Sequence, residues 1–430
     1  MFASLVSRAL RLLCYPHLVE RLPGPHPVGV RRVRIPGSVA CQLLYPAATA
    51  VGRRAPYWRP EAVEGLAEYS QLPEALFRSV LTLAHHPCAE APAPLESSEE
   101  GWPLVVFSHG LGGCEEMYSQ LCAFIASHGY VVFVPEHEDG SGCHATTADG
   151  EHVRFRRPPP GLVAQGKAAN VEFRAPFLAK RVDEICAALA YLLSPSPGGA
   201  LADVLATLDK AAGAQLIAHS FGCASAVLAA QNGGSGVLPA PISSVVLLDP
   251  WVFPLRDEVL RQGVAQVRSQ RPTRHQPPPN PSQPPHASPC PSEPPPTSPR
   301  LLTRGAVRAQ PTLCVLSEAW TRSAELRSVR TLLEASSEVA TLWAPGTRHQ
   351  SVADTATWAP SLLVRKAGAL GTAEKMHTTR IATAAACHGH MRSSLATETP
   401  LMTAAGLASA ALHVYRFGGT SGAPARAAHC

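Results

Sequence analysis

Short, continuous apolar runs recur along the chain, and most are separated by longer stretches with helical periodicity. A run without polar alternation is typical of a strand buried on both faces, and an intervening helix is typical of a parallel crossover. The pattern therefore predicts an α/β fold with a mainly parallel central sheet and helices on both faces. The predicted core strands are residues 104–108, 130–134, 214–218, 243–248, 312–316 and 338–343.

Two strands are expected before this alternation. Residues 27–35 and 40–46 are rich in apolar residues and flank Pro36-Gly37, which predicts an opening hairpin. Residues 140–175 are polar and rich in turn formers, so we expect a long excursion above the sheet there. Helices are predicted over about 62–86, 115–127 and 176–193.

Polar residues or glycines follow several of the predicted core strands. The loop 109–113 (His-Gly-Leu-Gly-Gly) follows the first of them, Asp249 ends the strand at 243–248, and His349 follows the last. The chemistry of such sheets lies at the carboxyl ends of the strands. We therefore expect the functional site at this edge.

Ser220 lies where the strand at 214–218 gives way to a helix of small residues. A sharp strand-to-helix turn of this kind is a nucleophile elbow, which lifts a serine hydroxyl out of the sheet. The turn requires small residues two places before and after the serine, here Ala218 and Gly222. An ordinary turn at the start of a buried helix would have the same residues, so the motif alone leaves both interpretations open.

A catalytic serine needs a histidine to take its proton and an acid to hold that histidine. The chain order in α/β-hydrolases is serine, acid, histidine. His349 follows a late strand and satisfies this order, whereas His137 and His144 precede Ser220. His349 is therefore the predicted base.

The acid is expected at a strand end between Ser220 and His349. Asp249 meets this condition, while Asp257 lies at the start of a predicted helix. A plain turn residue is the simpler interpretation of Asp249 alone. Its place in the order Ser220, Asp249, His349, each at a strand end, favours a catalytic triad.

Acyl transfer also requires N–H donors for the negative charge that develops on the carbonyl oxygen. The residue after the nucleophile, Phe221, supplies one donor by the logic of the motif. The glycines of the loop 109–113 allow close approach of the backbone, and Leu111 is the predicted second donor. His109 and His219 are predicted to support these groups.

The net charge of +5 is concentrated in one segment. Between Arg261 and Arg308 seven arginines accompany one acid, so the rest of the chain is close to neutral, which argues against a nucleic-acid-binding face. The twelve cysteines are spread singly and predict reduced thiols in a cytoplasmic setting. Cys387-His388-Gly-His390 fits no common zinc spacing, so no metal site is predicted.

Residues 1–23 are basic and amphipathic, which suits an organelle-targeting peptide, a membrane-associated surface helix or a terminus packed on the domain. Residues 268–304 are rich in proline and predict a disordered insertion. That insertion could bind an SH3- or WW-type partner, or be passive, or be a gene-model artefact. It divides the predicted hydrolase domain into residues 24–267 and 305–394, and residues 395–430 form a C-terminal tail.

The sequence resembles the platelet-activating-factor acetylhydrolase family of phospholipases A2, the group that joins the plasma and intracellular type II enzymes. The matching motifs run in family order over roughly residues 24–390, with the insertion left out. They are Gly24-Pro-His26, Gly65-Leu-Ala-Glu-Tyr69, Phe107-Ser-His-Gly-Leu-Gly112, Pro135-Glu-His137, His219-Ser-Phe-Gly222, Leu248-Asp-Pro-Trp251, Phe253-Pro-Leu255 and the segment from Gly346 to Asp354.

The resemblance implies an α/β-hydrolase fold with Ser220, Asp249 and His349 as the triad and Leu111 and Phe221 as oxyanion donors. It implies calcium-independent hydrolysis of a short or oxidised sn-2 acyl ester of a glycerophospholipid, without a cofactor. The implied partner is a phospholipid at a membrane or lipid surface. Apolar residues around Phe77, Leu81 and Leu83 are the expected contact with that surface.

The chain departs from the family pattern at several places. Ala218 and Cys223 stand where the elbow usually has glycines, Glu138 replaces a common arginine, and Pro250 replaces a small alanine. These changes leave two alternatives to the acetylhydrolase activity. The first is a general carboxylesterase or lipase, and the second is a catalytically weak relative that acts as a binding scaffold.

Overall fold

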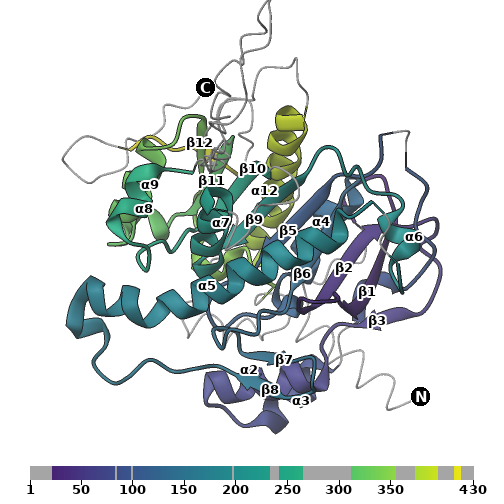
Figure 1. Ribbon diagram of the computed structural model, residues 1–430, viewed down its shortest axis with the longest axis horizontal. Coiled ribbons are helices and arrows are strands. Elements are labelled where there is room, and N and C mark those ends of the chain that lie inside the picture. The colour runs from purple at the N-terminus through teal and green to yellow at the C-terminus, as the bar shows by residue number, and fades with distance from the viewer. Residues whose placement is uncertain are drawn as a thin grey trace, which may run out of the picture.

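Among the residues that the structure describes, an eleven-stranded sheet forms the centre, in the order β13-β12-β11-β10-β9-β5-β6-β2-β1-β4-β3 (Figure 1). It is taken from a computed structural model that describes residues 22–82, 85–97, 100–195, 198–232, 242–264, 311–354, 373–395 and 411–417. The predicted insertion at 268–304, nearly all of residues 1–23 and most of residues 395–430 lie outside these ranges.

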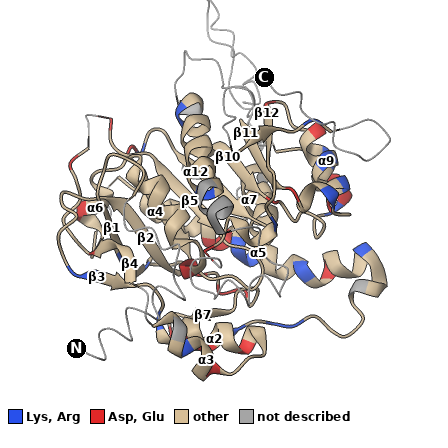
Figure 2. Ribbon diagram, turned by 180° about the vertical axis from the view of Figure 1, so that it is seen from behind, with Lys and Arg blue, Asp and Glu red and all other residues tan. Residues whose placement is uncertain are grey.

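Six neighbouring strands of the sheet run parallel, as the apolar runs predict. Figure 2 shows that the central strands are almost entirely uncharged. The charged residues gather on the helices α5 (Gly166–Leu192), α9 (Leu326–Glu334), α2 (Pro60–Ser70) and α3 (Glu74–Leu81). The parallel strands are β5 (Leu104–Ser108), β6 (Val131–Pro135), β9 (Ala214–His219), β10 (Ile242–Leu248), β11 (Thr312–Ser317) and β12 (Val339–Ala344).

Further strands extend the sheet at both sides, mostly in antiparallel pairs, with one parallel pair between the first strand and residues 85–90. The predicted hairpin forms β1 (Val28–Arg34) and β2 (Ala40–Pro46), and β2 joins it to β6. Beyond β1 lie β4 (His85–Glu90) and β3 (Arg54–Pro56), and β13 (His413–Val414) pairs with β12 at the opposite edge. The sequence pattern does not predict β13, because two residues carry no periodicity.

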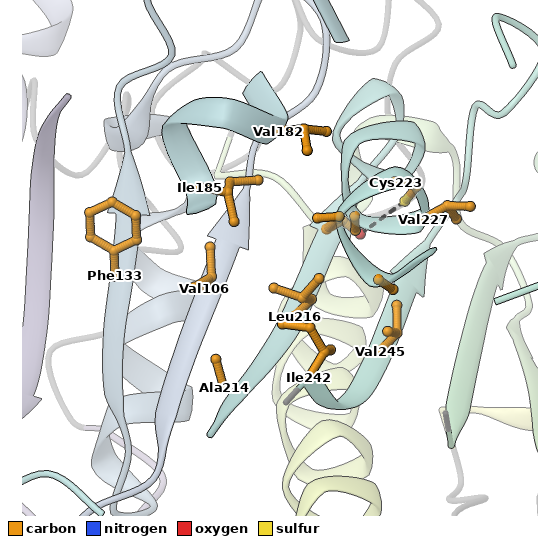
Figure 3. Close-up of a cluster of buried hydrophobic side chains, with 14 of the residues drawn as sticks. Val106, Phe133, Val182, Ile185, Ala214, Leu216, Cys223, Val227, Ile242 and Val245 are labelled. Carbon is orange, nitrogen blue, oxygen red and sulfur yellow. Dashed lines mark hydrogen bonds between the residues drawn. The ribbon is translucent and has the colours of Figure 1, made fainter. Parts of the chain in front are cut away.

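Helices cover both faces of the sheet. Alternation along β9 sends Leu216 into one core with α5 (Gly166–Leu192) and α7 (Phe221–Asn232), and Ile217 into another with α4 (Ser119–Ser127) and α12 (Ala373–Leu395). The first core also contains residues of α6 (Ala202–Leu205), α8 (Asp257–Gln262) and α9 (Leu326–Glu334). Figure 3 shows side chains of the strands packed beneath α5 and α7.

The predicted helix at 62–86 is wrong in its extent. The structure has two helices, α2 (Pro60–Ser70) and α3 (Glu74–Leu81), followed by strand β4. Gln71 adopts a left-handed conformation with φ of 56° and ends α2, and Pro73 separates it from α3. Apolar spacing continues across this break, so periodicity alone does not reveal it.

The excursion at 140–175 is more ordered than its composition indicates. It contains the hairpin β7 (His144–Thr146) and β8 (His152–Arg154), the 3₁₀ turn η2 (Val163–Gln165), and the first turns of α5. α5 thus begins at Gly166, ten residues before the predicted start, with Pro176 inside it. No helix among the described residues is long and apolar enough to cross a membrane.

The turn between β9 and α7 is packed against the end of β5. A Cβ atom added to Gly222 would lie 2.2 Å from the carbonyl oxygen of Ser108, a backbone atom that cannot move aside alone. The close approach of α7 to β5 therefore requires glycine at this position.

We predict that Gly222→Ala lowers the free energy of unfolding by about 1–3 kcal/mol, because the new methyl group forces the two backbones apart. Urea denaturation measures the loss. Gly198→Ala is the matched control, since a Cβ there meets nothing within 4 Å. An unfolding free energy equal for the two variants would contradict the packing argument.

We also predict that deletion of residues 270–299 leaves the fold intact. β10 and β11 pair directly from Val245 with Thr312 to Leu248 with Val315, so the strands on either side of the insertion hold each other. Loop length itself has a small entropic effect. The thermal midpoint should change by less than about 2 °C. Insoluble or non-cooperatively unfolding protein would show the prediction to be wrong.

Candidate active site

Ser220 stands in the turn between β9 and α7 with φ of 55°, in the left-handed region that favours glycine. Strained backbone at this point is a feature of the nucleophile elbow. Its N–H donates to the Leu248 carbonyl (3.0 Å), and its carbonyl accepts from the Trp251 N–H (3.0 Å). Neighbouring backbone therefore holds the strained turn.

His349 begins the 3₁₀ turn η4 (His349–Ser351), which follows β12. Its Nε2 lies 2.8 Å from Ser220 Oγ, and its Nδ1 lies 3.2 Å from Asp249 Oδ2. The structure thus brings together the three side chains that the sequence singles out, in hydrogen-bond contact and in the order serine, histidine, acid. This arrangement can move a proton from the serine hydroxyl to the imidazole.

Asp249 follows β10 and is almost fully buried, with φ of 43°. Besides His349, its carboxylate accepts hydrogen bonds from the N–H and the hydroxyl of Ser317. Sequence reasoning missed Ser317, although it is a polar residue at the end of an apolar strand and so carries the same signal as Asp249.

His219, beside the nucleophile, takes the supporting role expected of it. Its Nε2 lies 3.0 Å from the His349 carbonyl oxygen, and its Nδ1 lies 2.7 Å from the Tyr118 hydroxyl. Burial holds the pKa of His219 well below its usual range, and the neighbouring His349 adds to this effect, so the ring is neutral. The Tyr118 hydroxyl also accepts from the Gly110 N–H (3.3 Å).

The glycine N–H groups of the loop 109–113 already have acceptors. Gly110, Gly112 and Gly113 donate to Tyr118, Ser141 and the Gly110 carbonyl respectively. In the described part of the chain, no acceptor lies within hydrogen-bond reach of the Leu111 N–H. The Phe221 N–H opens α7, where a helix has no internal acceptor. Among the hydrogen bonds of the described residues, the N–H groups of both predicted oxyanion donors thus have no acceptor.

Arg181 of α5 holds the loop 109–113 through a hydrogen bond to its first residue. It is fully buried, donates to the His109 carbonyl (2.7 Å) and pairs with Asp139 (3.0 Å). Its guanidinium also lies over the Phe221 ring, 5.0 Å from the centroid. Sequence reasoning missed Arg181, because an arginine in a helical pattern is ordinarily assigned to the solvated face.

His137 is engaged away from the nucleophile. Its Nε2 contacts the Ser108 hydroxyl (2.9 Å) and its Nδ1 contacts Glu184 (2.7 Å). Burial raises the pKa of Glu184 to about 8 and holds the pKa of His137 well below its usual range. The two therefore form a hydrogen bond between neutral groups, which links β6 to α5.

The Cys387, His388 and His390 side chains do not converge. Cys387 is buried in the core, His388 stacks on His128, and His390 contacts the Pro311 carbonyl. Within the described ranges, one group of three possible metal ligands does come together, with ligand atoms within 4.8 Å: His219, Asp249 and His349. Both ring nitrogens of each histidine already have hydrogen-bond partners, which matches a proton relay.

The two unusual elbow residues contact each other. Cys223 is fully buried, and its thiol donates to the Ala218 carbonyl (3.1 Å). Figure 3 shows Cys223 among the apolar side chains of the core. Glu138, the third departure, forms an ion pair with Arg34 (2.7 Å). All three residues therefore have partners of their own.

The expected lipid contact around Phe77, Leu81 and Leu83 is wrong for Leu81. That side chain is 1% exposed and packs in a small core with Tyr57 and Trp58. Phe77 packs against the same cluster, and Leu83 lies outside the described residues. The exposed large apolar residues of the described chain are Val51, Leu72 and Leu76.

The chain is similar to known proteins over part of its length. The platelet-activating factor acetylhydrolase of Cavia porcellus is 31% identical over 179 residues, 39% of each chain. That of Bos taurus is 30% identical over 175 residues, 37% of each chain. The matches thus span about two fifths of the length of these curated relatives. A putative phospholipase A2 of Schizosaccharomyces pombe is 44% identical over 61 residues, 14% of this chain and 13% of its own.

The fold has a counterpart among solved structures. A ferulic acid esterase from Streptomyces cinnamoneus superposes with a TM-score of 0.55 at 16% identity, over 92% of this chain and 98% of that one. The protein thus has an α/β-hydrolase fold. The family model described as "Platelet-activating factor acetylhydrolase, isoform II" matches residues 16–267, more than half of the chain. The chain therefore belongs to the platelet-activating factor acetylhydrolase isoform II family.

Proposed function

We propose that this protein is a serine esterase that hydrolyses the short or oxidised sn-2 acyl ester of glycerophospholipids without calcium or another cofactor. The observation that carries the proposal is the hydrogen-bonded series Ser220, His349, Asp249, built on a strained serine. Relatives named platelet-activating factor acetylhydrolase support the choice of substrate. The proposed partner is a phospholipid at a lipid surface.

The first half of the reaction forms an acyl-enzyme. Ser220 Oγ attacks the sn-2 carbonyl carbon while His349 Nε2 takes the hydroxyl proton. Asp249 holds the imidazole with Nδ1–H toward its carboxylate and stabilises the resulting imidazolium. The N–H groups of Leu111 and Phe221 stabilise the oxyanion. When the carbon–oxygen bond to glycerol breaks, His349 returns its proton to the leaving oxygen, and a lysophospholipid departs.

The second half releases the acid. Water attacks the acyl carbon and gives a proton to His349, the same two N–H groups hold the oxyanion, and Ser220 leaves with that proton restored. The short-acyl preference, a cytoplasmic location and an SH3- or WW-type partner for residues 268–304 are further parts of the proposal. They rest on the family, on the single spacing of the cysteines along the sequence and on the proline content respectively.

We predict that a fluorophosphonate probe labels the wild-type protein and that Ser220→Ala abolishes labelling, because the probe reacts with an activated serine. Ser225→Ala is a matched control, since this serine is buried in α7 and its hydroxyl has no partner among the described residues. Labelling should survive a chelator. If the wild-type protein is not labelled, the scaffold alternative is favoured. If Ser220→Ala is labelled as strongly as wild type, Ser220 is not the nucleophile.

We predict that kcat/KM falls at least about tenfold between an acetyl and a long sn-2 acyl chain, since a site shaped for a short group has no room for added methylenes and excludes the longer chain sterically. Hydrolysis of a series of phosphatidylcholines that differ only in the sn-2 chain measures the preference. A preference for the long chain would replace the proposal with a general lipase or carboxylesterase.

A further inference from the structure

The end of β11 and the turn that follows it contact both Asp249 and His349. Ser317, the last residue of β11, donates its N–H to Asp249 Oδ1 (2.5 Å) and its hydroxyl to Oδ2 (2.6 Å). Both carboxylate oxygens are thus held by one residue. The Ser317 side chain is almost fully buried, so water does not compete for these hydrogen bonds.

Three residues further on, Trp320 covers the histidine. Its ring lies parallel to the His349 imidazole, with centroids 4.1 Å apart and an interplanar angle of 13°. The indole N–H donates to the Pro250 carbonyl (3.2 Å), and the backbone N–H of Trp320 donates to Ser317 Oγ (3.2 Å). The same serine therefore holds the carboxylate and anchors the stacked ring.

These contacts address two needs of the reaction. A carboxylate turns readily about its last torsion, so Asp249 requires a second donor to keep Oδ2 toward His349. The imidazole becomes cationic during each half-reaction, and the face of an indole attracts a cation. Among the described residues, the ionisable groups near the imidazole besides Asp249 are His219, whose ring centroid is 4.6 Å away, and Glu325, with which His349 interacts electrostatically.

We propose that Ser317 and Trp320 are positioning residues that act through the Asp249–His349 pair, Ser317 by fixing the carboxylate and Trp320 by stacking on the imidazole. The inference rests on the proposed function, because it requires this pair to serve acyl transfer from Ser220. Neither residue contacts the Ser220 hydroxyl in the hydrogen bonds of the site.

The test for Ser317 compares kcat and KM for acetyl-ester hydrolysis. Ser317→Ala should lower kcat about tenfold with KM within about twofold, since one hydrogen bond to a charged group is lost. Ser317→Thr keeps the hydroxyl and should recover most of the rate. Ser244→Ala, a buried serine at the far end of β10, is the matched control and should leave both constants unchanged.

A double-variant comparison separates positioning from a general effect on the fold. With an activated aryl acetate, residual hydrolysis by Asp249→Ala is measured with and without Ser317→Ala. A positioning role predicts that Ser317→Ala has less than about a twofold further effect, because its target carboxylate is gone. A full tenfold effect in both backgrounds would overturn the proposal for Ser317.

Trp320 is tested with Trp320→Phe and Trp320→Leu. The kcat values should fall in the order Trp, Phe, Leu with KM unchanged, because leucine retains apolar cover without a π face. Equal kcat for Trp320→Leu and wild type, or a rise in KM alone, would overturn its role. If a fluorophosphonate probe fails to label the wild-type protein, both the proposed function and this inference are contradicted. If the probe labels the wild-type protein but the Ser317 and Trp320 variants keep the wild-type kcat, this inference alone is contradicted.

Discussion

The parallel register of β9, β10, β11 and β12 sets the position of the triad and of Ser317. His219 pairs with Leu248, Leu248 pairs with Val315, and Ser317 pairs with Ala344, so the four strands end nearly level. Residues that follow these ends must then emerge at one edge of the sheet. Side chains 129 residues apart in sequence meet within 2.8 Å for this reason.

Much of this could be predicted from the sequence, because buried parallel strands carry a strong apolar signal. Ser220, Asp249 and His349 each follow such a strand, and their order decided between competing histidines and aspartates. Tyr118, Arg181 and Trp320 could not be found in this way. Their contacts depend on how a helix or turn packs on a distant strand. The hydrophobic periodicity of a single sequence carries no information about such packing.

The unusual elbow illustrates how the same turn accommodates different side chains. Gly222 is fixed by the backbone of β5, 2.2 Å from where its Cβ would lie. Ala218 and Cys223 face the core, where a methyl group and a thiol find apolar neighbours and a carbonyl acceptor. The constraint on size is therefore severe at one of the three small positions and weaker at the other two.

The hydrogen bonds through Tyr118 and His219 leave only one arrangement of protons. The His349 carbonyl can only accept, so the neutral His219 ring must carry its proton on Nε2, and its Nδ1 must accept from Tyr118. The Tyr118 oxygen in turn accepts from Gly110. The loop 109–113 and the backbone of His349 are consequently joined by three hydrogen bonds in series. Each donor in the series points from the loop toward His349. No hydrogen bond in that chain can reverse its direction without breaking the next one, so the protein alone fixes the direction of these donors.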